Sequence, residues 1–249
     1  MHHFFVTPDC VDEKYISITG SDVNHLKNVL RVKIGEELLV SDGQGKDYMC
    51  RIDGIDDKEI KALIVSEEFS GTELPARLYL FQGLPKSDKM ELIIQKAVEL
   101  GCFEIIPVNT ARSIVKLDKK KEDAKLKRWK AISESAAKQS RRSIIPNIHS
   151  VMTFKEAIEY AKDFDINLIP YENFKDMTET KEAVDKVAGG MNVGIFIGPE
   201  GGFEESEVDM AVENGAKRIS LGKRILRTET AGMAILSVLM FRIEERNDN

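Results

Sequence analysis

The 249-residue sequence has only three cysteines, one tryptophan and four histidines, and it lacks a long apolar run. Cys10, Cys50 and Cys102 are odd in number and widely spaced, which fits neither a disulfide framework nor a paired-cysteine metal motif. The longest apolar stretch, 231–241, is much shorter than the roughly 20 residues of a membrane-spanning helix. The histidines are scattered, so we expect no metal site.

The sequence also lacks the common phosphate-binding motifs and a secretion signal. It contains no G-x-x-x-x-G-K-[ST] and no G-x-G-x-x-G after a strand, which argues against a P-loop or an ordinary dinucleotide-binding fold. The N-terminus has no charged segment followed by an apolar one, so we expect a cytoplasmic protein. A composition of 42% hydrophobic and 31% charged residues indicates a folded protein with a real core, in one large or two modest domains.

Positive charge is concentrated in one segment of an otherwise acidic chain. The net charge is -6, yet 112–142 contains twelve Lys or Arg and four acidic residues, a local charge of +8. A basic segment on an acidic protein is typical of a phosphate-binding surface, because the local field governs binding. A solvated helix with charge pairs four residues apart explains the same composition.

Residues 1–71 are expected to form a small β-barrel. Alternating apolar and polar residues at 38–40, 48–52 and 60–65, separated by Gly and Asp, indicate short strands joined by turns. A helix is expected at 22–30. A linker at 67–75, which contains Ser70, Gly71 and Pro75, places the domain boundary near residue 72.

Residues 72–249 alternate between apolar strands and helices. Strands are expected at 77–81, 103–108, 167–169, 193–197 and 218–221, and helices at 88–100, 121–139, 180–187, 205–214 and from Thr228 onwards. Near-continuous apolar strands between helices indicate an α/β domain with a mostly parallel sheet covered on both faces.

Two glycine-bearing segments near the C-terminus are the most informative motifs. Gly198-Pro199-Glu200-Gly201-Gly202 follows one expected strand, and the segment 221–232 (LGKRILRTETAG) follows another. Glycine has no Cβ, so both segments could bring bare backbone N–H and C=O groups against one bound small molecule. Either loop alone could instead be a tight turn.

These two loops, in this order, resemble those of the SPOUT superfamily of knotted RNA methyltransferases. The segments 25–31 (HLKNVLR), 84–91 (LPKSDKME) and 95–101 (QKAVELG) narrow the resemblance to the ribosomal RNA small subunit methyltransferase E family, which methylates N3 of a uridine in 16S rRNA. His3, Glu204 and Lys223 depart from the family pattern. The resemblance implies a PUA-like RNA-binding barrel at 1–71, a SPOUT domain with a trefoil knot at 72–249, S-adenosylmethionine as cofactor, 16S rRNA within the small ribosomal subunit as partner, and a homodimer.

The resemblance also implies which residues bind the cofactor and the RNA. Cofactor contacts are expected from Leu168, Pro170, Gly198, Pro199, Glu200, Gly201, Gly202, Leu221, Gly222, Ile225, Leu226, Thr230 and Ala231. Phosphate contacts are expected from Arg31, Lys33, Lys86, Lys89, Arg112, Arg128, Arg141 and Arg142. Trp129 could stack on a base, although a Trp on a helix face more often belongs to the core.

The chemistry of a uracil N3 singles out two further residues. This nitrogen is protonated at pH 7, so its proton must leave before it can attack a methyl group. Arg227 is the candidate to stabilise negative charge on the base, and Glu229 is the candidate to accept or orient the proton, with the positive end of the last helix beside them. Alternatively, Arg227 and Glu229 form an ordinary ion pair, Glu200 only holds its loop, and Thr228 or Thr230 caps the helix.

Two other functions remain open. The same loops serve SPOUT enzymes that methylate a ribose 2′-OH or a guanine N1, although 84–101 and the N-terminal barrel argue against these. A non-catalytic RNA-binding assembly factor with this fold is the other alternative.

Overall fold

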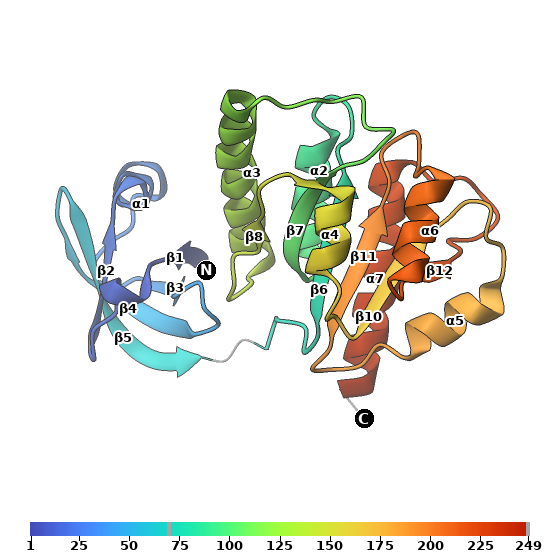
Figure 1. The fold of residues 1–249 in the computed structure, drawn as a ribbon. Coiled ribbons are helices and arrows are strands. Elements are labelled where there is room, and N and C mark those ends of the chain that lie inside the picture. The colour runs from blue at the N-terminus through green and yellow to red at the C-terminus, as the bar shows by residue number, and fades with distance from the viewer. Residues whose placement is uncertain (69–70, 248–249) are drawn as a thin grey trace. The chain divides into compact units, whose positions relative to one another are not determined.

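The computed structural model describes residues 1–68 and 71–247, which form two compact units (Figure 1). The first unit comprises Met1–Glu73 and Ala137–Ile145, and the second comprises Leu74–Ala136 and Pro146–Asn249. The return segment 137–145 adds to the first unit residues that the sequence pattern placed in the second. Ser70 of the expected linker and the last two residues of the chain lie outside the described residues.

The first unit contains a curled sheet built from short alternating strands (Figure 1). Its described strands are β1 (His2–Phe5), β2 (Tyr15–Thr19), β3 (Glu37–Ser41), β4 (Asp47–Ile55) and β5 (Glu59–Glu68), in the order β1-β3-β4-β5-β2. Every second side chain points inward, so Ile16, Leu38 and Ile60 share one apolar core. The predicted PUA-like barrel is confirmed as this curled sheet.

The helix predicted at 22–30 has two parts. A short turn η1 (Pro8–Cys10) precedes β2, and α1 (Ser21–Asn24) continues into the π-helical segment η2 (His25–Leu30). Val23 and Leu26 bury their side chains in the barrel core. Arg31 ends the segment with a left-handed φ of 56°.

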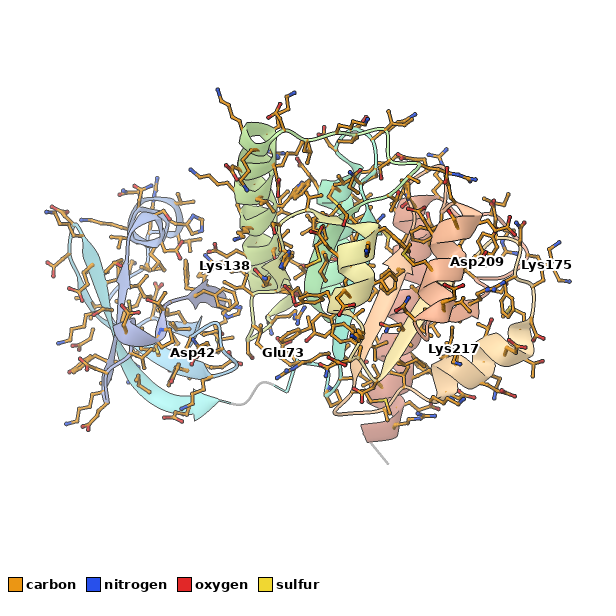
Figure 2. All side chains as sticks on the ribbon, in the orientation of Figure 1. Asp42, Glu73, Lys138, Lys175, Asp209 and Lys217 are labelled. Atoms are coloured by element: carbon orange, nitrogen blue, oxygen red, sulfur yellow. The ribbon has the colours of Figure 1, made fainter. Side chains whose placement is uncertain are left out.

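Polar contacts attach the return segment to the rest of the first unit. The Lys138 ammonium lies 3.1 Å from Asp22 Oδ2, and the Ser143 hydroxyl donates to Asp47 at 2.6 Å. Arg142 Nε donates to both oxygens of Glu73, at 3.1 and 3.2 Å. Glu73 and Lys138 are labelled in Figure 2.

The second unit is an α/β layered domain, as predicted. In the described residues its sheet has the order β12-β10-β11-β6-β7-β8, with β9 beside β7, and all pairings are parallel. The strands are β6 (Arg77–Gly83), β7 (Cys102–Asn109), β8 (Asn147–Ile148), β9 (Met152–Thr153), β10 (Ile166–Pro170), β11 (Asn192–Ile197) and β12 (Lys217–Ile219). The helices are α2 (Lys89–Glu99), α3 (Lys119–Ser140), α4 (Phe154–Tyr160), α5 (Met177–Asp185), α6 (Glu205–Glu213) and α7 (Thr228–Asn247).

Helices cover both faces of this sheet because its strands are apolar on both sides. Phe196 points to the face that α4 and α6 cover, where it stacks on Phe81 with ring centroids 4.4 Å apart. The next residue, Ile197, points to the opposite face, where a Cβ on Gly232 of α7 would lie 3.9 Å from it. No described helix is sufficiently long and apolar to span a membrane.

The strand order brings the functional loops together. β10, β11 and β6 are adjacent and parallel, so the loops that follow them leave from one edge of the sheet, where α/β proteins bind ligands. After β12 at the end of the sheet, α7 returns to pack against α2, β6 and β11. The trefoil knot that the sequence resemblance implies stays a prediction.

Candidate functional site

The 198–202 loop follows β11 and has glycine where no other residue fits. A Cβ on Gly198 would lie 2.9 Å from the carbonyl carbon of Gly202, so crowding excludes a side chain there. Gly202 has a φ of 67°, a backbone conformation that other residues rarely adopt. Its N–H donates to the Pro199 carbonyl at 2.9 Å, which closes the loop into a tight turn.

The 220–227 segment follows β12 and leads to α7. Gly222 has a φ of 101°, and a Cβ there would have no atom within 4 Å among the described residues. The backbone conformation, not crowding, therefore selects glycine at this position. Leu221 and Leu226 are half-buried, whereas Ile225 is 86% exposed.

A buried hydrogen-bonded chain fixes the start of α7 against the 198–202 loop. The Gln82 amide of β6 donates to Thr228 Oγ1 at 2.9 Å, and the Thr228 hydroxyl donates to the Gly198 carbonyl at 2.6 Å. Thr228 thus connects the start of α7 with β6 and with the 198–202 loop. Gln82 Oε1 is buried without a hydrogen-bond partner among the described groups.

Three charged side chains meet beside this chain. The Lys89 ammonium at the start of α2 lies 3.0 Å from Glu200 Oε1 and 3.6 Å from Glu229 Oε2. The backbone N–H of Lys86 also donates to Glu200, at 3.1 and 3.3 Å. One cation therefore connects the 198–202 loop with the first turn of α7.

These contacts set the ionisation of Lys89 and Glu200. The hydrogen bond with Glu200 raises the pKa of Lys89, and Glu229 adds to this effect. Burial opposes ionisation of Glu200, but backbone hydrogen bonds and Lys89 outweigh it and lower the pKa of this carboxyl. Glu200 therefore connects its loop to Lys86 and Lys89 as an ionised group.

Arg227 and Glu229 do not pair with each other in the described structure. Glu229 keeps 15% of its side-chain exposure and turns its buried Oε2 towards Lys89. Arg227 is exposed, and its carbonyl accepts the Ala231 N–H at 2.8 Å as α7 begins. Its guanidinium is therefore available to a bound molecule. Thr230 is exposed and Ala231 is half-buried on the same turn.

Two expected cofactor residues lie on β10. Leu168 is fully buried and its side chain belongs to the sheet core, so its contact with a cofactor stays a prediction. Pro170 is half-buried at the carboxyl end of the same strand. Pro199 is buried, and Gly201 is exposed with its carbonyl accepting from the Arg112 guanidinium at 2.9 Å.

The eight expected phosphate contacts fall into two groups. Arg31, Lys33, Lys86 and Arg141 are exposed. Arg112, Lys89, Arg128 and Arg142 are engaged within the protein: Arg112 binds Gly201, Lys89 binds two glutamates, and Arg128 forms a two-point ion pair with Glu91. Arg142 is only 3% exposed and binds Glu73, so it is a structural residue and not a phosphate contact.

Trp129 belongs to the core of the second unit. Its side chain is 2% exposed, which excludes base stacking in this structure.

Sequence reasoning missed two residues that organise the site. Gln82 is the single amide side chain among the aliphatic and aromatic residues of the segment LYLFQG, which was a usable signal. Glu207 accepts the Ala111 and Glu204 N–H groups, both at 2.9 Å, and so holds the connection before α3.

Comparison with known proteins identifies the family to which this chain is related. Residues 72–240 match the model of an RNA methyltransferase domain, and residues 18–65 match that of an RNA methyltransferase PUA domain. The chain is 37% identical to ribosomal RNA small subunit methyltransferase E of Bacillus subtilis over 231 residues, 92% of this chain and 90% of the relative. It is 34% identical to the Mesomycoplasma hyopneumoniae protein of the same name, over 95% of this chain and 98% of the relative.

A solved structure agrees with these relatives. Ribosomal RNA small subunit methyltransferase E from Neisseria gonorrhoeae, bound to S-adenosyl methionine, matches with a TM-score of 0.83 and 31% identity, over 98% of each chain. The match spans both the curled sheet and the α/β domain. The chain therefore belongs to the ribosomal RNA small subunit methyltransferase E family.

Proposed function

We propose that the protein methylates N3 of a uridine in 16S rRNA with S-adenosylmethionine as methyl donor. The observation that carries the proposal is the buried chain Gln82–Thr228–Gly198, which places the glycine loop 198–202 beside the first turn of α7, where Arg227 and Glu229 lie. Family membership over most of the chain supports the same activity.

The site suits S-adenosylmethionine in its backbone conformation. Gly202 and Gly222 have backbone conformations that favour glycine, and at both positions the space that a Cβ would take has no described atom within 4 Å. The two loops can therefore approach the adenine, ribose and amino-acid portions of a nucleoside cofactor closely. When bound, the cofactor supplies an electrophilic methyl group, so the protein has only to place the acceptor and manage its proton.

Arg227 and Glu229 are suited to prepare the acceptor nitrogen. The Glu229 carboxylate takes the N3 proton, which leaves a lone pair and a negative charge on the base. The exposed Arg227 guanidinium and the positive end of α7 stabilise that charge on the carbonyl oxygens. Both groups act on the base itself, which gives the reaction its preference for an ionisable ring nitrogen.

The proposed partner is 16S rRNA, held by exposed cations of both units. Arg31 and Lys33 of the first unit and Lys86 of the second are exposed, as are Lys116, Lys119, Lys120, Lys121, Lys127 and Lys130 in and before α3. Their charges can neutralise phosphates along the RNA.

A homodimer is the second partner that we propose. α2 and α7 pack together and expose Leu92, Val238 and Phe241. A second copy of the same surface would cover these side chains.

Phe241→Asp should convert a dimer to monomers in sedimentation analysis, whereas Met177→Asp, an equally apolar exposed site on α5, should not. A wild-type monomer at micromolar concentration would reject the dimer.

Mapping of 16S rRNA modifications by mass spectrometry tests the methylation itself. RNA from a strain without the gene should lack one methyl group on a uracil base, and the wild-type gene should restore it. A missing methyl on a ribose or a guanine would assign the protein to another reaction. An unchanged methylation pattern, with no heat in calorimetry with S-adenosylmethionine, would indicate an RNA-binding assembly factor.

A further inference from the structure

Lys89 was expected to contact RNA phosphate, but its ammonium is directed into the protein. It contacts Glu200 Oε1 at 3.0 Å and Glu229 Oε2 at 3.6 Å, and 31% of its side chain is exposed. Other lysines in this region, such as Lys86, have exposed side chains and could bind phosphate without breaking a pair. The arrangement therefore calls for another role.

We propose that Lys89 is a positioning residue, which holds the Glu229 carboxylate in its orientation while fixing Glu200 of the 198–202 loop. This inference rests on the proposed function only in taking Glu229 as the proton acceptor. Lys89 has three N–H groups, and one ammonium can bind both carboxylates. With Oε2 directed to Lys89, Oε1 is the oxygen that remains for the base.

The geometry makes the cation necessary. Glu229 Oε2 is buried and accepts no hydrogen bond among the described groups, so the 3.6 Å ion pair with Lys89 is its compensating contact. Glu200 has further support from the Lys86 N–H, at 3.1 and 3.3 Å. Without the Lys89 charge, the two carboxylates repel each other. Glu229 then loses its orientation more easily than Glu200, which keeps the Lys86 N–H.

Other charged groups around Glu229 do not replace Lys89. On α2, Glu91 is bound to Arg128, and Asp88 is exposed at the start of the helix. β11 has no titratable side chain, and β6 has only Arg77 and Tyr79 at its opposite end. On α7 itself, Arg227 is exposed and makes no ion pair with Glu229 in the described structure.

A charge-neutral variant should release the Glu229 carboxylate from its position. In Lys89→Met the carboxylate loses its cation and keeps Glu200 as a like-charged neighbour, so its carboxyl ¹³C signal at neutral pH should move or broaden. Lys89→Arg should keep the wild-type signal. In the double variant Lys89→Met with Glu200→Gln the change should be smaller, because the like charge is gone.

Selective ¹³C labelling of glutamate carboxyls, with Glu229→Gln for assignment, measures this signal by NMR without any reaction. Single-turnover methylation, with saturating RNA and cofactor, should be about tenfold or more slower in Lys89→Met and much less affected in Lys89→Arg. Lys86→Gln is the matched control for the NMR signal: it should reduce the salt dependence of RNA binding and leave the Glu229 signal unchanged.

The two proposals fail in different ways. A Glu229 carboxyl signal that does not change in folded Lys89→Met overturns the positioning role, whatever the enzyme methylates. A signal that changes as expected, in a protein that transfers no methyl to RNA, supports the positioning role and rejects the proposed function. A reduced salt dependence of RNA binding in Lys89→Met, with an unchanged Glu229 signal, would return Lys89 to phosphate contact.

Discussion

At the scale of single residues, glycine, threonine and lysine define the site through three different physical effects. Gly198 is required by crowding, and Gly202 by a left-handed backbone. Thr228 uses its hydroxyl as both donor and acceptor to connect the start of α7 with β6 and the 198–202 loop. Lys89 joins a carboxylate of that loop to one in the first turn of α7. Contacts that fix a site in advance lower the entropic cost of binding.

Gly198→Ala should weaken binding of S-adenosylmethionine by about tenfold or more, equivalent to about 1.4 kcal/mol. The added Cβ would lie 2.9 Å from the carbonyl carbon of Gly202 and force the loop open. Gly232→Ala in α7 is the control, because its Cβ would keep ordinary distances of 3.8 and 3.9 Å to its neighbours. Calorimetry measures both affinities, and equal affinities for wild type and Gly198→Ala would remove this loop from the cofactor site.

Arg227→Ala should lower the methylation rate more than it weakens RNA binding. A cation that stabilises charge developing on the uracil acts mainly in the transition state. Raising the pH ionises part of the base beforehand, so the deficit of the variant should shrink towards the pKa of N3. Single-turnover rates across pH, with saturating RNA and cofactor, measure this. A deficit that stays constant with pH would leave Arg227 only a role in placing the base.

At the scale of secondary-structure elements, the sequence predicted what depends on local pattern. Continuous apolar runs identified the strands at 77–81 and 193–197, and the long helices followed from their periodicity. The short α4 and the two-residue strands β8 and β9 were missed, because such brief segments are stabilised by packing and not by propensity. The π-helical turn before Arg31 has no distinct sequence signal.

The site itself was only partly predictable for the same reason. The glycine loops are visible in the sequence because backbone conformation limits the residue type. Local sequence rules cannot identify ion-pair partners that are far apart in the chain. The carboxylate partners of Lys89, Arg128 and Arg142 lie 37 to 140 positions away and come close only in the folded protein. A charged residue in a basic segment therefore gives no sign of whether it meets solvent or a carboxylate.

Substitutions of two neighbouring arginines after α3 should have different effects, one on the free energy of unfolding and the other on RNA binding. Arg142→Ala should lower the free energy of unfolding by about 3 kcal/mol, because it leaves Glu73 without its buried partner. Arg141→Ala should change stability little, since its side chain is exposed, but should reduce the salt dependence of RNA binding by about one phosphate contact. Chemical denaturation and salt titrations measure the two effects. Equal stability losses in both variants would contradict the structural role of Arg142.

At the scale of the whole molecule, the chain joins a curled sheet that matches an RNA methyltransferase PUA domain to an α/β domain that matches an RNA methyltransferase domain. The return segment 137–145 belongs to the first unit although α3 begins in the second. Arg112 lies in the connection before α3, and its guanidinium binds the Gly201 carbonyl, so the 198–202 loop contacts the chain that leads into the basic helix α3.

Transfer of a labelled methyl group to small ribosomal subunits tests the central claim most directly. Subunits from a strain without the gene would be incubated with the purified protein and labelled S-adenosylmethionine, and the 16S rRNA digested to nucleosides. The account predicts one labelled product, N3-methyluridine, formed by the wild-type protein and formed much more slowly by Glu229→Gln. Label in a 2′-O-methyl nucleoside or a methylguanosine, or no label at all, would contradict it.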